Sequence, residues 1–76
     1  MRIEDFKTGI YQHFKGKKYI VLGLARHSET LDWLVIYIPL YENENAKMWV
    51  RPFEMFVEEV EVGDKLLPRF KYISSI

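Results

Sequence analysis

The amino-acid sequence predicts an all-β fold, a small five-stranded SH3-like barrel with one 3₁₀ turn before the last strand. β-Branched and aromatic residues concentrate in five short runs, and turn-forming residues separate these runs. The segment WVRPFEMFVEEV then breaks the strand pattern between the fourth and fifth runs. Five short strands with brief turns also suit an OB-like barrel, although that fold usually has longer strands and a complete helix.

The chain of 76 residues is short enough to form one domain, over residues 1–76. Its five strands are expected at residues 9–14, 18–27, 33–41, 47–51 and 57–62. Glycine and polar residues that favour turns follow these strands, at Gly16–Lys18, in HSETLD, in ENENA and at Val62–Asp64.

The 3₁₀ turn is predicted just after Pro52. Proline favours an extended conformation at Arg51 and therefore ends the fourth strand there. It also suits the first position of a helical turn, where the local dipole favours an acid such as Glu54. Phe53 and Phe56 are three residues apart, so one 3₁₀ turn directs both rings towards the core.

The second and third strands are expected to form a hairpin with its turn centred on Thr30. This register pairs Gly23 with Tyr37 and Leu24 with Ile36, and alternation then separates two sets of side chains. The same two sets result if the centre moves by a whole residue, so the alternation does not distinguish these centres. The aliphatic set comprises Ile20, Leu22, Leu24, Leu34, Ile36, Ile38 and Leu40. The aromatic set comprises Tyr19, Trp33, Tyr37 and Tyr41, with His27 beside them. We predict that the aliphatic face forms the core. The C-terminal residues, a second copy in a homodimer or a ligand could each cover the aromatic face.

Composition and charge exclude several classes of function. There is no cysteine, so disulfides and the usual Cys/His zinc signatures are absent, and no metal or cofactor is predicted. The formal net charge of zero does not favour nucleic acid, although Lys15, Lys17 and Lys18 interleave with aromatic residues. No segment approaches the roughly 20 apolar residues of a membrane span. The N-terminus lacks the apolar run of a signal peptide, and the expected location is the cytoplasm.

Hydrophobic residues make up 49% of the chain and aromatic residues 16%. A small single core cannot hide that much apolar surface, because a short chain buries only about 60% of its unfolded surface. We therefore expect part of it to face a partner, a ligand or another copy of the chain.

The run ARHSET, at residues 25–30, contains the side-chain types of catalytic sites. His27 and Ser28 are neighbours, however, and neighbours in a strand point to opposite faces, so a Ser–His dyad is not favoured. The favoured interpretation is structural: Ser28 and Thr30 bond to the turn backbone, and His27 stacks on Trp33.

An anion site is the functional alternative for this run. Arg26 and Arg51, with the hydroxyls of Ser28 and Thr30, could hold a phosphate or carboxylate through bidentate contacts. In the structural interpretation, Arg26 instead pairs with Glu29 or Glu54. Arg51 then pairs with an acid or lies on an aromatic ring.

Several segments together resemble a known family: GIYQHFKGKKYIVLGLARHSET, LVIYIPLY, WVRPFEMF and PRF. They resemble short bacterial proteins called domain of unknown function 1653, over about Gly9 to Tyr72. The pieces H-x-K-G, A-R-H-S-E-T and W-V-R-P-x-x-M-F in this order make the resemblance specific. It implies a small all-β bacterial domain and supplies no catalytic residues. Its pattern highlights His13, Lys15, Gly16, Arg26 to Thr30, Tyr37, Trp49 to Pro52, Glu54 and Arg69.

The sequence therefore predicts a binding domain with an aromatic and arginine-bearing surface, rather than an enzyme. Its expected partner is an unknown protein or a small anionic ligand. The alternative hypothesis is a small hydrolase or nucleic-acid-acting protein that uses Arg26, His27, Glu29 and Arg51. The candidate binding residues are Arg26, His27, Ser28, Glu29, Thr30, Trp33, Tyr37, Trp49, Arg51 and Glu54.

Overall fold

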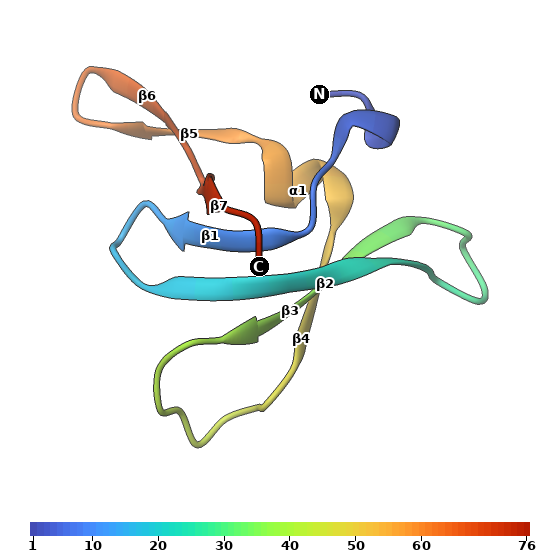
Figure 1. The fold of residues 1–76 in the computed structure, drawn as a ribbon. Helices are drawn as coiled ribbons and strands as arrows, with labels where there is room; N and C mark the ends of the chain where they lie inside the picture. Colours follow the sequence, from blue (N-terminus) through green and yellow to red (C-terminus); the bar gives the residue numbers. More distant parts are fainter.

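The computed structural model describes residues 1–76 and contains two antiparallel sheets (Figure 1). The larger sheet has five strands in the order β4-β3-β2-β1-β7. Their bounds are Gly9–His13 for β1, Lys18–Arg26 for β2, Trp33–Pro39 for β3, Trp49–Pro52 for β4 and Phe70–Ser74 for β7. The smaller sheet is a hairpin of β5 (Glu59–Val62) and β6 (Lys65–Pro68). The helix α1 spans Phe53–Val57, and a 3₁₀ turn spans Ile3–Asp5.

The all-β class is confirmed, and each of the five predicted strands overlaps an observed one. The SH3-like barrel is not confirmed, because the sheet is open and ends at the edge strands β4 and β7. The segment predicted as a 3₁₀ turn is a short α-helix, α1. Two strands were not predicted, β6 and β7. The fifth predicted strand, β5, pairs with β6 in the separate hairpin rather than closing a barrel.

The core consists mainly of aromatic rings packed on one face of the larger sheet. Phe56 of α1 stacks on Phe70 of β7 with ring centroids 4.0 Å apart. Tyr11 and Tyr37 meet the ring of Phe56 edge-on, at 5.4 Å in both cases. Phe6 packs against the same group from the N-terminal segment, which lies beside α1 in Figure 1. The buried apolar residues are Tyr11, Val21, Val35, Tyr37, Phe53, Phe56 and Phe70.

The prediction that the aliphatic face forms the core was therefore wrong. Val21 pairs with Tyr37 and both are buried, whereas Leu22 and Leu40 are nearly half exposed on the chain's surface. The rings of Phe56 and Phe70 pack edge-to-face with the tyrosines of the sheet, and Phe6 stacks on Tyr11. The aromatic face is thus covered by the segments of the chain itself that carry these rings. The C-terminal part contributes Phe70, as one of the three alternatives had anticipated.

The predicted centre of the hairpin at Thr30 was also wrong, and the predicted alternation holds only as far as Val21, where the pairs have a register centred one residue earlier. Tyr19 pairs with Pro39, and Val21 pairs with Tyr37, but beyond a β-bulge at Leu22 the pairing changes. Gly23 then faces Ile36 instead of the predicted Tyr37, and Leu24 faces Val35. A bulge inserts one unpaired residue and so exchanges the faces of the residues that follow it. As a result, Leu24 packs against the core.

Gly9 allows the close approach of β1 and β7. Its φ is +140°, a conformation that residues with a side chain rarely adopt. A Cβ atom at this position would lie 2.4 Å from the carbonyl oxygen of Ser74. The edge strand β7, which carries Phe70 into the core, therefore depends on glycine at this point.

Candidate functional site

The polar run ARHSET forms the turn between β2 and β3, and its side chains bond to the turn itself. The Nδ1 atom of His27 accepts hydrogen bonds from the backbone N–H groups of Glu29 (3.1 Å) and Thr30 (3.3 Å). Thr30 Oγ1 accepts from the N–H of Asp32 at 3.2 Å. The backbone N–H of His27 donates to the carbonyl of Asp32 at 2.8 Å. These contacts agree with the structural interpretation for Thr30, whereas the hydroxyl of Ser28 forms no hydrogen bond and His27 Nδ1 bonds to the turn backbone instead.

Arg26 takes the position on Trp33 that had been predicted for His27. Its guanidinium carbon lies 4.1 Å from the Trp33 ring centroid, and Nη1 donates to the carbonyl of Leu31 at 3.2 Å. The cause is the bulge at Leu22, which pairs Arg26 directly with Trp33. Arg26 forms no ion pair with either acid expected for it, because the chain's two salt bridges are Arg2–Glu4 and Arg69–Glu58.

Arg51 is held in a different place, over the aromatic core. It lies half-buried on β4, and its Nε donates a hydrogen bond to Tyr37 Oη at 3.3 Å. Its guanidinium carbon is 5.5 Å from the centroid of the Phe70 ring. Arg51 therefore lies against an aromatic ring, one of its two expected surroundings. It forms no salt bridge, and its two terminal nitrogens make no hydrogen bond within the chain.

His13 packs against the same Phe70 ring, with ring centroids 4.9 Å apart. Its Nδ1 accepts a hydrogen bond from the backbone N–H of Lys15 at 3.1 Å. Burial lowers the pKa of His13, and the positive charges of Arg51, Arg69 and Lys15 lower that pKa further. The site therefore gathers cationic groups around an imidazole that favours the neutral form.

Arg69, which follows β6, bonds to Glu58, the residue that precedes β5. Its Nη2 donates to Glu58 Oε1 at 2.6 Å, and its backbone N–H donates to the Glu58 carbonyl at 3.0 Å. The Nε of Arg69 is buried and has no hydrogen-bond partner. Arg69 is thus compensated by one carboxylate, whereas Arg51 has none. We call His13 and the three basic side chains that lower its pKa, Lys15, Arg51 and Arg69, the cationic cluster.

A line of tyrosines runs from Arg51 towards the connection between β3 and β4. Tyr19 lies 5.3 Å from Tyr37, centroid to centroid, and its hydroxyl is 2.8 Å from that of Tyr41. Burial raises the pKa of Tyr19, and the Tyr41 hydroxyl contributes in the same direction. Lys17 Nζ lies 4.2 Å from the Tyr41 ring centroid.

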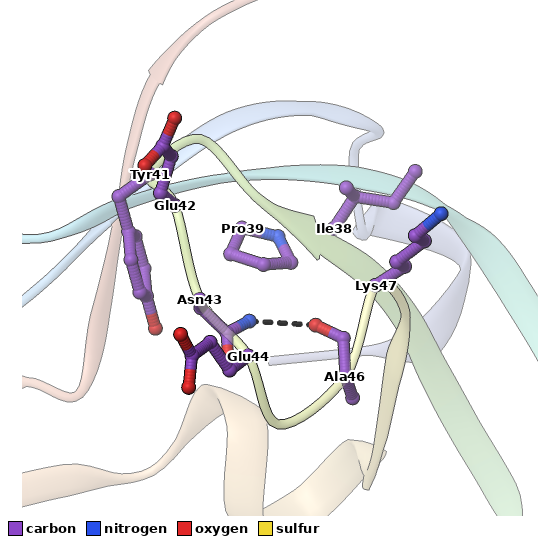
Figure 2. Close-up of a pocket in the computed structure, with 8 residues that line it drawn as sticks. All are labelled: Ile38, Pro39, Tyr41, Glu42, Asn43, Glu44, Ala46 and Lys47. Carbon is purple, nitrogen blue, oxygen red and sulfur yellow. Dashed lines mark hydrogen bonds between the residues drawn. The ribbon is translucent and has the colours of Figure 1, made fainter.

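The connection between β3 and β4, residues 40–48, lines open pockets on the surface. One pocket of about 500 Å³ is lined by Ile38, Pro39, Tyr41, Glu42, Asn43, Glu44, Ala46 and Lys47 (Figure 2). Asn43 closes the loop, because its Nδ2 donates to the Ala46 carbonyl at 2.6 Å and its Oδ1 accepts from the N–H of Asn45 at 2.8 Å. Figure 2 shows the Glu42 and Glu44 side chains on the Tyr41 side of the loop, with Lys47 on the opposite side.

The ten predicted site residues fall into two groups. The first lies around the β2–β3 turn, where Arg26 to Thr30 end β2 and form the turn, and Arg26 lies on Trp33. Trp33 and Glu54 line one pocket of about 370 Å³ beside this turn. In the second group, Tyr37 contacts Arg51 and pairs with Trp49 across the sheet.

Sequence reasoning did not place His13, Lys15 and Arg69 among the site residues. The pieces H-x-K-G and PRF were the available signals, but neither shows that His13 and Arg51 meet at Phe70. No group of three or more potential metal ligands occurs in the structure. None of its helices has the length and apolar character needed to cross a membrane.

The fold and the cationic cluster define a small all-β domain with basic side chains set on an aromatic core. The model of the family described as "Protein of unknown function (DUF1653)" matches residues 9–72. A crystal structure of a protein of the same family from Bordetella bronchiseptica is also similar. The two chains share 37% sequence identity, the match covers 99% of this chain and 96% of that one, and the TM-score is 0.93. The chain therefore belongs to the DUF1653 family, as its motifs had indicated. A comparison with curated proteins finds no match.

Proposed function

We propose that this chain is a binding domain that recognises an anionic group, a phosphate or a carboxylate, at Arg51. The observation that carries the proposal is the half-buried guanidinium without an acidic partner. Its Nε donates a hydrogen bond to Tyr37 Oη, while the two terminal nitrogens form no hydrogen bond within the chain. A guanidinium presented in this way suits bidentate contacts with phosphate or carboxylate oxygens.

The rest of the cationic cluster supports the same ligand chemistry. Lys15 and Arg69 add positive charge near His13, whose pKa they lower together with Arg51. Phe70 shields one side of the site from water, and electrostatic attraction is stronger where solvent is partly excluded. A bound anion would favour the protonated form of His13 and so raise its pKa.

The alternative hypothesis of a hydrolase or nucleic-acid-acting protein gains no support. It requires Arg26, His27, Glu29 and Arg51 to act together. His27 Nδ1 is instead occupied by backbone N–H groups of the turn, and Arg26 lies on Trp33. Arg51 contacts Tyr37 and Phe70 over the core.

We place the domain in the cytoplasm as a further part of the proposal, because it has no cysteine and the reducing cytosol does not support disulfides.

The proposal is tested by an NMR titration of the histidine ring resonances in increasing inorganic phosphate, and in acetate as the carboxylate probe. Binding at the cationic cluster should raise the pKa of His13 and leave the His27 resonances unchanged. Arg51→Gln should abolish the response. Arg26→Gln is the matched control, because it removes the same charge at the β2–β3 turn. A His13 response that persists in Arg51→Gln, or its absence in the unmodified chain, would refute the proposal.

A second prediction concerns the hydroxyl of Tyr37. Tyr37→Phe keeps the buried ring but removes the acceptor that orients Arg51, so the affinity for phosphate should fall about three- to tenfold. Tyr11→Phe is the matched control, because it removes a hydrogen bond to the Lys7 carbonyl outside the site. Isothermal titration calorimetry of both variants makes the comparison. Equal phosphate affinity in the two variants would show that Tyr37 does not orient Arg51 for binding.

A further inference from the structure

Another pocket at the connection between β3 and β4, next to the line of tyrosines, has a charge character opposite to that of the cationic cluster and shares Glu42 and Glu44 with the pocket in Figure 2. It has a volume of about 580 Å³ and lies between the β1–β2 turn and the connection from β3 to β4. Its lining residues are Lys17, Tyr41, Glu42, Asn43, Glu44, Asn45 and Trp49. It therefore combines two aromatic side chains with two carboxylates, whereas the cationic cluster combines aromatic rings with arginines.

The two carboxylates are not neutralised within the chain. Neither Glu42 nor Glu44 forms a salt bridge, and no side-chain hydrogen bond to either of them occurs. Figure 2 shows both side chains on the Tyr41 side of the loop. Asn43 holds this part of the loop through its bonds to Asn45 and Ala46, so both acids are carried on a closed turn.

A cation already occupies one aromatic face of this pocket. Lys17 Nζ lies 4.2 Å from the centroid of Tyr41, within the distance at which a cation is attracted to a ring. Lys17 is itself exposed and makes no ion pair, so little else holds it there. Trp49, on the wall of the same pocket, is 37% exposed, and no cation in the chain lies over its ring.

We infer that this pocket binds an organic cation, a guanidinium or an alkylammonium group, between Tyr41 and Trp49, with Glu42 and Glu44 as counter-charges. Lys17 is its internal occupant and leaves the Tyr41 ring when the ligand enters. Aromatic faces and carboxylates together suit such cations, since the ring quadrupole and the acid both attract positive charge. This inference uses a different set of residues from the anion site and does not depend on it.

The test uses N-acetyl-L-arginine amide as the probe, at low ionic strength because an exposed pocket is screened by salt. Its neutral isostere, N-acetyl-L-citrulline amide, is the control ligand. Fluorescence is followed in a Trp33→Phe background, which leaves Trp49 as the single indole; Trp33 lies outside this pocket. The arginine compound should change the emission saturably and the citrulline compound should not. Equal responses to the two compounds would overturn the inference.

Three variants locate the site. Glu42→Gln combined with Glu44→Gln should weaken binding at least about threefold. Lys17→Gln should strengthen it by a similar factor, because the Tyr41 ring no longer has a competitor. Lys47→Gln is the matched control for Lys17, since it removes a lysine that points away from Tyr41 (Figure 2) and should leave the affinity unchanged. All these side chains are exposed, so the variants should fold.

Two outcomes would contradict the inference directly. One is undiminished affinity in the double glutamate variant. The other is an equal gain in affinity in Lys17→Gln and Lys47→Gln, which would indicate an effect of net charge alone.

Free L-arginine as a further ligand separates two sources of the cation. Equal affinity for the free and the blocked compound assigns recognition to the side chain, as in a protein partner, and tighter binding of free arginine assigns it to a small molecule.

Discussion

The ring of Phe70 brings together two basic residues that are far apart in the sequence. His13 and Arg51 both pack on it, and Arg51 lies close enough to lower the pKa of His13. Arg51 has one hydrogen bond and no counter-ion, although it is half-buried. Arg26 has the same charge but is stacked on Trp33 and bonded to the turn, so the two arginines are not equivalent sites.

The lowered pKa of His13 makes the stability of the domain depend on pH. The unfolded chain takes up a proton on this histidine near its ordinary pKa of 6.5, and the folded chain does so only at lower pH. Below pH 6.5 the unfolded state therefore binds more protons, and the free energy of unfolding falls. Urea unfolding at pH 7.5 and pH 5 measures the loss. His13→Gln should show a smaller loss than the unmodified chain. An identical pH dependence in His13→Gln and the unmodified chain would contradict this assignment.

At the level of the elements, a bulge in β2 and the pairing of β1 with β7 position the candidate site residues. The bulge at Leu22 in β2 brings Leu24 to the core and Arg26 onto Trp33. The contact of β1 with the edge strand β7 brings Phe70 beneath Arg51 and His13. The hydrogen bond from the Phe14 N–H to the Arg69 carbonyl, at 2.9 Å, extends this contact beyond β1.

The glycine at the start of β1 should therefore be essential to the β1–β7 pair. Gly9→Ala places a Cβ 2.4 Å from the Ser74 carbonyl oxygen at a φ of +140°, and it should lower the free energy of unfolding by about 1–3 kcal/mol or more. Gly23→Ala is the matched control, because a Cβ there meets nothing within 4 Å. Chemical denaturation followed by circular dichroism compares the two. A cost for Gly9→Ala no larger than that for Gly23→Ala would show that β7 can shift to accept the methyl group.

In the whole molecule, other parts of the chain cover only one face of the larger sheet. The aromatic face is closed by α1, the N-terminal segment and Phe70, and the opposite face leaves Leu22, Leu40 and Val50 exposed. The domain has one core with seven buried apolar side chains. A chain of this size has a small margin of stability, so single core rings should matter to the entire fold.

Phe56 is the residue on which that core most depends. It is 1% exposed and contacts Phe6, Tyr11, Tyr37 and Phe70 through its ring. Phe56→Ala should cost about 3–5 kcal/mol, a large part of the stability of a small domain. Met55→Ala, one position earlier in α1 and 46% exposed, should cost far less. Thermal unfolding by calorimetry measures both. A similar melting temperature for the two variants would mean that the core rearranges to fill the cavity.

Much of the fold could be predicted where local signals were sufficient. Strands β1 to β5 lie within or close to their predicted ranges, because β-branched and aromatic runs bounded by turn residues are short-range patterns. β6 and β7 were missed because Pro68 and Arg69 interrupt the C-terminal run. Of the cationic cluster, Arg51 was predicted as a candidate. His13 and Arg69 could not be placed beside it, because they are 38 and 18 residues away along the chain.

By itself, the sequence determined the all-β class, the positions of strands β1 to β5 and the turn at His27 to Asp32, because each depends on neighbouring residues only. The tertiary structure alone decided which face of the sheet is buried, the register beyond the bulge and the meeting of His13, Arg51 and Phe70. Alternation separates the two faces of a strand but does not say which one is covered. The choice follows from how the rings of Phe6, Phe56 and Phe70 pack with Tyr11 and Tyr37, and that packing joins residues from both ends of the chain.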